Sequence, residues 1–418
     1  MNLTGITHYS TTTKGIGGLL KKRISDFIVS EITLNGKTLK NLIFGEWEGK
    51  KEIEFEPTES KDDTKEYLHF TMEKFNLDTN TALRKITRQC HCSQKRLGYA
   101  GMKDKRGITS QRISFWQPNI EKLKKFNDKF ISLREPEWSN QRIEIGNHKG
   151  NYFEITIRNI LLNEKELRKE TEECFQQMKK GLANYFGEQR FGGIRQITHR
   201  VGREFVNGNF EQAVLLYLTS PSEGEEKEIA IARKNLFKTK DYSKASKEFP
   251  SKFRYELAIL HHLCKYPKDF IGAFQNLPKH LIYMFTHAYQ SYLFNEIINL
   301  RIERGIGLEP IEGDVLEDGI VTAPLFGLDT KISEGVPGEI EKEILEKEKI
   351  NLTNFKIKSF PELSCKGTIK KIKIIPKELK LISIEDDEFF EGKKLKISFS
   401  LDKGNYATTV SRELMKNP

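Results

Sequence analysis

The sequence predicts an α+β protein in which a discontinuous domain, built on a mixed or antiparallel sheet, is interrupted by a mainly helical second domain. At 418 residues the chain is longer than one hydrophobic core ordinarily spans. Strand-like patterns dominate its first part and return near its end, and helical periodicity dominates between them. We therefore expect residues 1–193 and 369–418 to form one domain and residues 194–368 to form the inserted one.

The composition is that of a charge-rich globular chain. Lys and Arg number 69 against 59 Asp and Glu, a formal net charge of +10. This balance permits a polyanionic partner without requiring one. No apolar run is long enough to span a bilayer, and the N-terminus lacks the order of a signal peptide. We expect a cytoplasmic protein that does not associate with membranes.

The five cysteines do not predict disulfides or a metal site. Their number is odd and their spacing is not that of a disulfide framework. Cys90-His91-Cys92 contains metal-binding residue types, but adjacent residues point to alternate sides and no CxxC or HxxxH partner follows. We expect no metal.

The first part of the chain opens in antiparallel strands. Phe27-Ile28-Val29 is strand-like, and Asn35-Gly36 indicates a hairpin because both residues tolerate a positive φ. A polar loop is expected at Pro57–Glu66. Asp78 or Thr79 can then cap a helix whose apolar positions are Leu83, Ile86 and Cys90.

That helix leads to Gly98–Arg112, a pattern typical of strand, charged turn and strand. Asp104 lies among Lys103, Lys105 and Arg106. The turn could simply be solvated, as most charge clusters are. It could also hold a carboxylate ionised by neighbouring cations, which suits a nucleophile. Nothing inside the stretch decides between these interpretations.

A second hairpin and a capped helix are expected next. Arg142–Ile145 and Tyr152–Ile157 flank a turn at residues 146–150, so we predict that they pair. Asn163 with Glu166 is typical of a helix start, and an apolar stripe follows until about Gly181.

The run Asn184–Gly193 mixes aromatic residues and glycines with amide and guanidinium groups. It can be a tight turn packed by Phe186 and Phe191, or part of a binding site. Helical patterns follow at 210–217, 230–236, 255–266 and 281–304, loops with short strands at 305–338, and strands at 368–375, 379–384 and 395–401.

Taken together, these runs resemble the TruD family of tRNA pseudouridine synthases, in an archaeal-type member. The resemblance rests on Ala100–Arg106 with Thr109 and Gln111, on Asn184–Gly192, and on Phe399–Thr408 with Arg412-Glu413. It covers essentially the whole length. Gly107 departs from the family, which commonly has alanine there, and we expect no chemical consequence.

The resemblance implies isomerisation of uridine to pseudouridine in tRNA, typically at position 13, without metal or cofactor. It implies that Asp104 is the catalytic nucleophile, attacking either the base or the sugar C1′. Lys21 would keep Asp104 ionised. Phe186 would stack on the target base and Asn184 would hydrogen-bond beside it, because stacking tolerates ring rotation and the nucleotide must be extruded. Phe27 and Glu31 match further substrate-binding residues.

Two other functions remain possible from the residues alone. A non-catalytic RNA-binding or chaperone protein could use the same scaffold, since the basic balance and the aromatics would suffice. A metal-dependent hydrolase would need ligand spacing that the sequence lacks. No obligatory protein partner is predicted.

Overall fold

The computed structural model describes residues 4–44, 54–58, 64–193, 195–222 and 224–417. The chain divides into two compact units, one of Met1–Tyr9 with Ala183–Lys373 and the other of Ser10–Leu182 with Ile374–Pro418. We call the first the helical unit and the second the sheet unit. The sheet unit is discontinuous, with its limits at 182/183 and 373/374, and the first residues of the chain join the helical unit.

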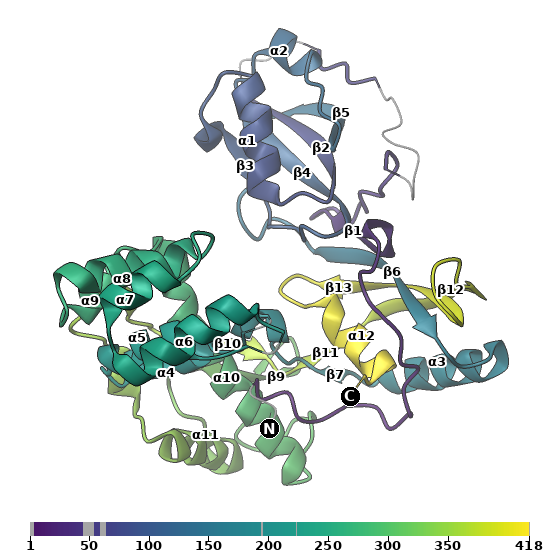
Figure 1. Ribbon diagram of the computed structural model, residues 1–418. Coiled ribbons are helices and arrows are strands. Elements are labelled where there is room, and N and C mark those ends of the chain that lie inside the picture. Colours follow the sequence, from purple (N-terminus) through teal and green to yellow (C-terminus); the bar gives the residue numbers. More distant parts are fainter. Residues whose placement is uncertain (1–3, 45–53, 59–63, 194, 223, 418) are drawn as a thin grey trace. The chain divides into compact units, whose positions relative to one another are not determined.

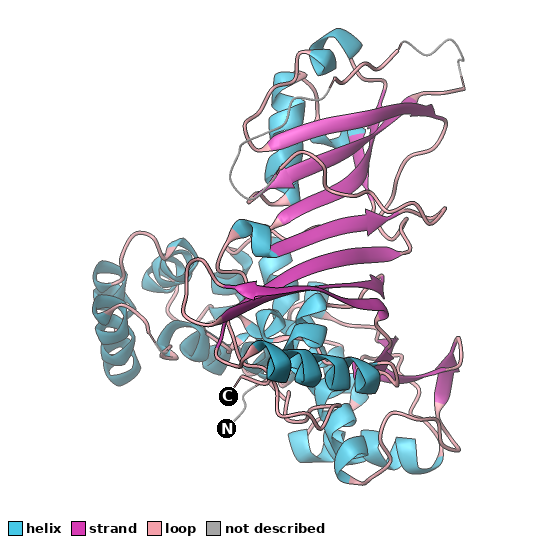
Figure 2. Cartoon of the chain, turned by 90° about the vertical axis from the view of Figure 1, so that its right-hand side faces the viewer, coloured by secondary structure: helices cyan, strands magenta, loops and turns pink. Residues whose placement is uncertain are grey.

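The sheet unit contains an eight-stranded mixed sheet among the described residues. Its order is β12-β13-β6-β1-β4-β2-β5, and β3 pairs with β4. Strand β1 runs parallel to β4, and the other pairs in this sheet are antiparallel. Figure 2 shows the strands side by side. Their bounds are β1 Phe27–Ile32, β2 Tyr67–Phe75, β3 Leu97–Tyr99, β4 Ile108–Trp116, β5 Ile131–Ser139, β6 Gly150–Ile160, β12 Lys377–Asp386 and β13 Lys393–Asp402.

Helices cover this sheet over two separate apolar cores. Strands β2, β4 and β5 pack with α1 (Thr79–Gln89). Strands β1, β6 and β13 pack with α3 (Glu164–Met178) and α12 (Ala407–Met415). The short helix α2 (Ile120–Lys124) and the 3-10 turns Ile24–Asp26 and Gln94–Arg96 complete the unit (Figure 1).

The predicted helix starts are confirmed. The Asp78 side chain accepts a hydrogen bond from the Thr81 N–H at 2.9 Å. The Asn163 side chain accepts one from the Glu166 N–H at 3.0 Å. Each bond satisfies a backbone donor that the first turn of a helix leaves unpaired.

The predicted hairpin of Arg142–Ile145 with Tyr152–Ile157 is wrong. Strand β6 pairs with β1 on one side and β13 on the other, so neither edge is open to residues 142–145. Those residues are not a strand. The Ile143 N–H instead bonds to the Ser114 hydroxyl at 3.0 Å, and the Gly146 N–H bonds to the Ala100 carbonyl at 2.7 Å.

The Asn35-Gly36 turn does form: Ile32 and Thr38 make a bridge across it, and Gly36 has φ 86°. Part of the loop predicted at Pro57–Glu66 lies outside the described residues.

The helical unit packs its helices around α10, with a small sheet ordered β10-β9-β8. A Cβ on Gly202 would lie 2.0 Å from the Phe285 carbonyl oxygen, so glycine allows α4 to approach α10 closely. The bounds are α4 Thr198–Val206, α5 Phe210–Thr219, α6 Lys227–Thr239, α7 Tyr242–Glu248, α8 Arg254–Lys265, α9 Phe270–Gln275, α10 Lys279–Glu303, α11 Gly335–Glu348, β8 Val315–Glu317, β9 Ile320–Leu325 and β10 Thr368–Lys371.

Short elements remain at the crossings between units and in the loops: β7 (Leu182–Ala183), β11 (Lys373–Ile374), and the 3-10 turns Glu188–Phe191, Leu352–Phe355 and Pro361–Leu363. The fold is thus α+β, with a mixed sheet and a mainly helical inserted part. Within the described residues, no helix has both the length and the apolar character needed to cross a membrane.

Candidate active site

Asp104 lies in the loop between β3 and β4, the strand–turn–strand predicted from the sequence. Side chains of the surrounding elements hold this loop. The Gln111 amide donates to the Gly101 carbonyl at 3.0 Å, and the Lys103 N–H donates to the Thr79 hydroxyl at 3.0 Å. The backbone that carries Asp104 is therefore fixed from both β4 and α1, which favours a preorganised carboxylate.

The Asp104 carboxylate pairs with Lys21. The Lys21 ammonium donates to Asp104 Oδ1 at 3.0 Å, and the two side chains are 16% and 40% exposed. A second residue of the Asp104 loop binds the same segment: the Arg106 guanidinium donates to the Lys21 and Lys22 carbonyls at 2.6 and 2.7 Å. Lys21 and the β3–β4 loop therefore hold the Asp104 carboxylate in place, and part of the carboxylate remains exposed.

Phe27 supports that cation. The Lys21 ammonium lies 3.8 Å from the centre of the Phe27 ring, a cation–π contact. The ring is buried, at 2% exposure, and packs against Phe153 at 6.2 Å between centroids. Gly107, which immediately precedes β4, is close to Phe27 as well: a Cβ on Gly107 would lie 2.4 Å from the Phe27 carbonyl oxygen. An added methyl group at Gly107 would therefore require the Phe27 backbone to shift.

Glu31 lies in the same unit, buried at 1% exposure. Its carboxylate pairs with the Lys103 ammonium at 2.8 Å and accepts from the Arg112 N–H at 3.0 Å. Lys103 also donates to Asn151 at 2.8 Å. Glu31 therefore reaches Asp104 through the residue that precedes it in the loop.

A third lysine approaches the loop from the buried side. The Lys74 ammonium, on β2, donates to the Asp104 main-chain carbonyl at 2.7 Å, and the residue is fully buried. Burial lowers the pKa of Lys74 to about 8, against the opposing effect of the nearby Asp104 and Asp78 carboxylates.

Asn184 and Phe186 belong to the helical unit. The Asn184 amide donates to the Lys371 carbonyl at 2.8 Å. The Phe186 N–H donates to the Asn295 side chain at 2.9 Å, and its ring, 6% exposed, meets Phe294 edge-on at 5.5 Å.

Two cations flank the Phe186 ring. The Lys370 ammonium lies 5.1 Å and the Arg190 guanidinium 5.6 Å from its centre. Burial lowers the pKa of Lys370 to about 8. The structure thus brings Lys21, Phe27 and Asp104 together and joins Glu31 to them through Lys103. Within the helical unit, it gives Asn184 and Phe186 a basic and aromatic setting.

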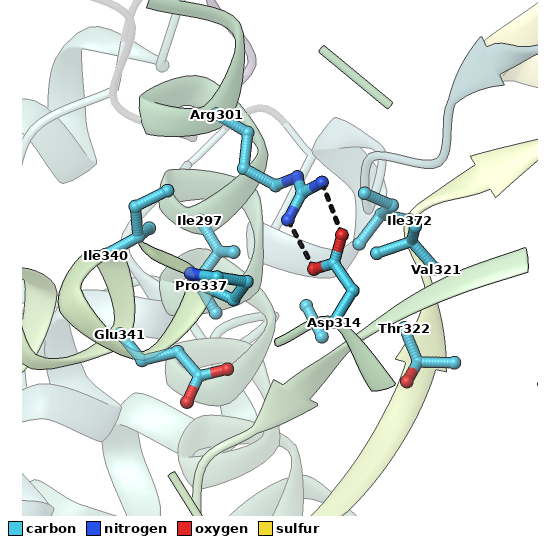
Figure 3. A pocket seen from close by; sticks show the side chains of 10 residues that line it. Ile297, Arg301, Asp314, Val321, Thr322, Pro337, Ile340, Glu341 and Ile372 are labelled. Atoms are coloured by element: carbon cyan, nitrogen blue, oxygen red, sulfur yellow. Dashed lines mark hydrogen bonds and ion pairs between the residues drawn. The ribbon is translucent and has the colours of Figure 1, made fainter. Parts of the chain in front are cut away.

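Figure 3 shows the side chains that line a pocket of the helical unit. Its volume is about 10 Å³, roughly the space of one water. The Arg301 guanidinium and the Asp314 carboxylate face each other in it, joined at 2.6 and 3.0 Å, and both are almost fully buried. Burial raises the pKa of Glu341, whose oxygens accept bonds from Ser333. These contacts are structural.

The residues that sequence reasoning missed are mostly those that support the Asp104 loop through buried contacts. Lys103 and Arg106 belong to the charged run around Asp104, so the sequence pointed to them. Nothing in the sequence pointed to Lys74 or Asn151.

Among the residues that the structure describes, no group of three or more His, Cys, Asp or Glu side chains could hold a metal ion. The fold and the site define an α+β protein with a cation-held aspartate at the rim of a mixed sheet.

Comparison with known proteins identifies the family. The family model for tRNA pseudouridine synthase D (TruD) matches residues 3–319 and 316–414. A Methanococcoides burtonii protein named "Probable tRNA pseudouridine synthase D" is 38% identical over 99% of this chain and 96% of its own. A Methanococcus maripaludis "Probable tRNA pseudouridine synthase D 2" is 40% identical over 96% and 95%.

A solved structure agrees. The crystal structure of the Methanosarcina mazei protein assigned as tRNA pseudouridine synthase D (TruD) has a TM-score of 0.79 and 36% identity, covering 99% of this chain and 97% of that one. The chain belongs to the TruD family of tRNA pseudouridine synthases, which are isomerases.

Proposed function

We propose that this chain isomerises uridine to pseudouridine in tRNA, at position 13, with Asp104 as the nucleophile and no metal or cofactor. The observation that carries the proposal is the partly exposed Asp104 carboxylate, 3.0 Å from the Lys21 ammonium in a loop held on several sides. Membership of the TruD family supports the reaction class.

The reaction needs a carboxylate and little else from the protein. The bond from C1′ to N1 breaks, a bond from C1′ to C5 forms, and the proton on C5 is replaced by one on N1. Asp104 can attack C1′ or the base, and either adduct returns the carboxylate when the rotated base rejoins the sugar. A carboxylate fixed in place lowers the entropic part of the barrier.

The remaining site residues divide into two groups. Lys21 is proposed to bind beside the target nucleotide, while the buried contacts of Phe27 and Glu31 favour support of Lys21 and Lys103 over direct contact with RNA. Phe186 is proposed to stack on the extruded base and Asn184 to hydrogen-bond beside it; both are buried as well, so this proposal requires that RNA binding exposes them. We propose accordingly that the sheet unit is the catalytic domain and the helical unit the inserted, RNA-binding one.

A tRNA transcript incubated with the purified protein, with and without a chelator, tests this function. The expected result is one pseudouridine per transcript, at position 13, formed equally in both conditions. Binding of the transcript without any pseudouridine would instead indicate a non-catalytic RNA-binding protein. Loss of the product in chelator would contradict the metal-free mechanism.

Binding of tRNA should be strongly salt-dependent, because phosphate neutralisation releases counterions. We expect affinity to fall at least about tenfold over a fourfold rise in salt, and Lys370→Met to lower the slope of log K against log salt by roughly 0.7–0.9. The measurement is a titration at several salt concentrations. Lys279→Met is the matched control, since Lys279 is exposed and pairs with Glu362 at 3.1 Å.

An affinity that does not change with salt would count against a basic RNA-binding surface. An equal change of slope in the Lys279→Met variant would show that the position beside Phe186 has no special part in binding.

A further inference from the structure

We propose that Lys74 is a positioning residue for the nucleophile, holding the Asp104 backbone from the buried side and placing a buried positive charge near its carboxylate. The inference rests on the proposed role of Asp104. It adds a supporting residue from strand β2, and that residue has no exposed surface.

The geometry is unusual for a lysine. A fully buried ammonium ordinarily pairs with a carboxylate, because removing a charge from water is costly. The Lys74 ammonium instead donates to a main-chain carbonyl, that of Asp104, at 2.7 Å. The bond therefore fixes the backbone of the residue whose carboxylate performs the chemistry, and Lys21 holds the same residue by its side chain.

The charged groups around Lys74 come from two elements. Asp104 and Lys103 face it from the β3–β4 loop, and Asp78 faces it from the start of α1. Its register partners on the two neighbouring strands, Thr109 on β4 and Ile131 on β5, are uncharged. The positive charge of Lys74 is thus offset partly by the nucleophile itself.

Loss of this charge should be visible in the pH profile. Burial lowers the pKa of Lys74 to about 8, so the ammonium loses its proton as pH rises through that value. The neutral amine can still donate to the Asp104 carbonyl, but this bond is weaker than one from the ammonium and fixes the backbone of the nucleophile less firmly. We therefore expect the rate of the chemical step to fall above about pH 8.

The test is the rate of pseudouridine formation at saturating enzyme, from pH 6.5 to 9.5 in steps of about half a unit. Lys74→Met has nearly the length of lysine without the charge. We expect its rate at pH 7 to be lower by on the order of 10- to 100-fold, with tRNA affinity nearly unchanged and no alkaline fall near pH 8. Lys74→Arg stays charged at both pH values. The ratio of its rate to the wild-type rate should therefore be higher at pH 9 than at pH 7.

Two controls separate this role from others. Lys370 also titrates near pH 8 but lies in the helical unit, so Lys370→Met should keep the alkaline fall. Lys85→Met removes a lysine of the sheet unit that pairs with Asp128 at 2.7 Å, and its rate and profile should match wild type. Thermal unfolding of Lys74→Met shows whether the variant is folded.

A folded Lys74→Met variant with the wild-type rate and the wild-type alkaline fall would overturn the proposal. If Lys74→Arg does not fold, the Lys74→Met profile still decides the matter. The outcome is separate from the proposed function: an inactive Asp104→Ala variant beside a normal Lys74→Met variant would refute the positioning role alone.

Discussion

Replacing Asp104 with alanine is expected to abolish pseudouridine formation while tRNA affinity stays within about threefold of wild type, since one carboxylate contributes little to binding a polyanion. The Lys21 ammonium would lose its partner at 3.0 Å but would remain on the Phe27 ring, so the local structure should persist. The measurement is product formation on a tRNA transcript over hours, beside an equilibrium binding titration.

Asp104→Asn sharpens this prediction. The amide keeps the size of the side chain and can accept a bond from Lys21, but it is not a nucleophile. It should be as inactive as alanine. Retained turnover in either variant would show that another group attacks the nucleotide.

Removing the Glu31 carboxylate is expected to destabilise the sheet unit strongly. Glu31→Ala leaves the Lys103 ammonium, 7% exposed as a residue, without the carboxylate it contacts at 2.8 Å. Breaking one side of a buried ion pair typically costs about 3–5 kcal/mol of unfolding free energy. Because Lys103 precedes Asp104, activity should fall as well. Denaturant unfolding measures the change in stability.

The matched control is Glu173→Ala, whose carboxylate contacts Lys169 at 3.8 Å on an exposed face of α3. It should change the unfolding free energy by less than about 0.5 kcal/mol. The double variant Glu31→Leu with Lys103→Met removes both charges and should recover much of the lost stability. If Glu31→Ala were no more destabilising than Glu173→Ala, the pair would not hold the loop.

Local signals predicted local structure well. The helix caps Asp78 and Asn163 were readable because a side chain that caps a first turn acts within three residues. The strand, turn and strand around Asp104 could be predicted for the same reason, since alternation and a charged turn lie in one stretch.

Non-local pairing could not be predicted in the same way. Strand β6 was expected to pair with the preceding segment, but its partners β1 and β13 lie far away in the sequence. Helix α11 was missed at its start because Gly335, Pro337 and Gly338 are typical of a loop. The expected elements ended with the strand at 395–401, so helix α12 was missed.

The support of the site escaped prediction because it depends on burial. Lys74 and Glu73 are adjacent charged residues in a strand, which ordinarily indicates a solvated face, yet both are fully buried. The Glu73 carboxylate accepts from three successive N–H groups, those of residues 42–44. Only the three-dimensional structure shows which distant groups satisfy such charges.

The most direct test of the central claim is position-resolved mapping of pseudouridine in tRNA from cells that make this protein, cells that lack it, and cells that make only the Asp104→Ala variant. The account predicts pseudouridine at position 13 in the first and uridine at that position in the other two. Pseudouridine at position 13 in all three, or its restoration by the Asp104→Ala variant, would contradict it.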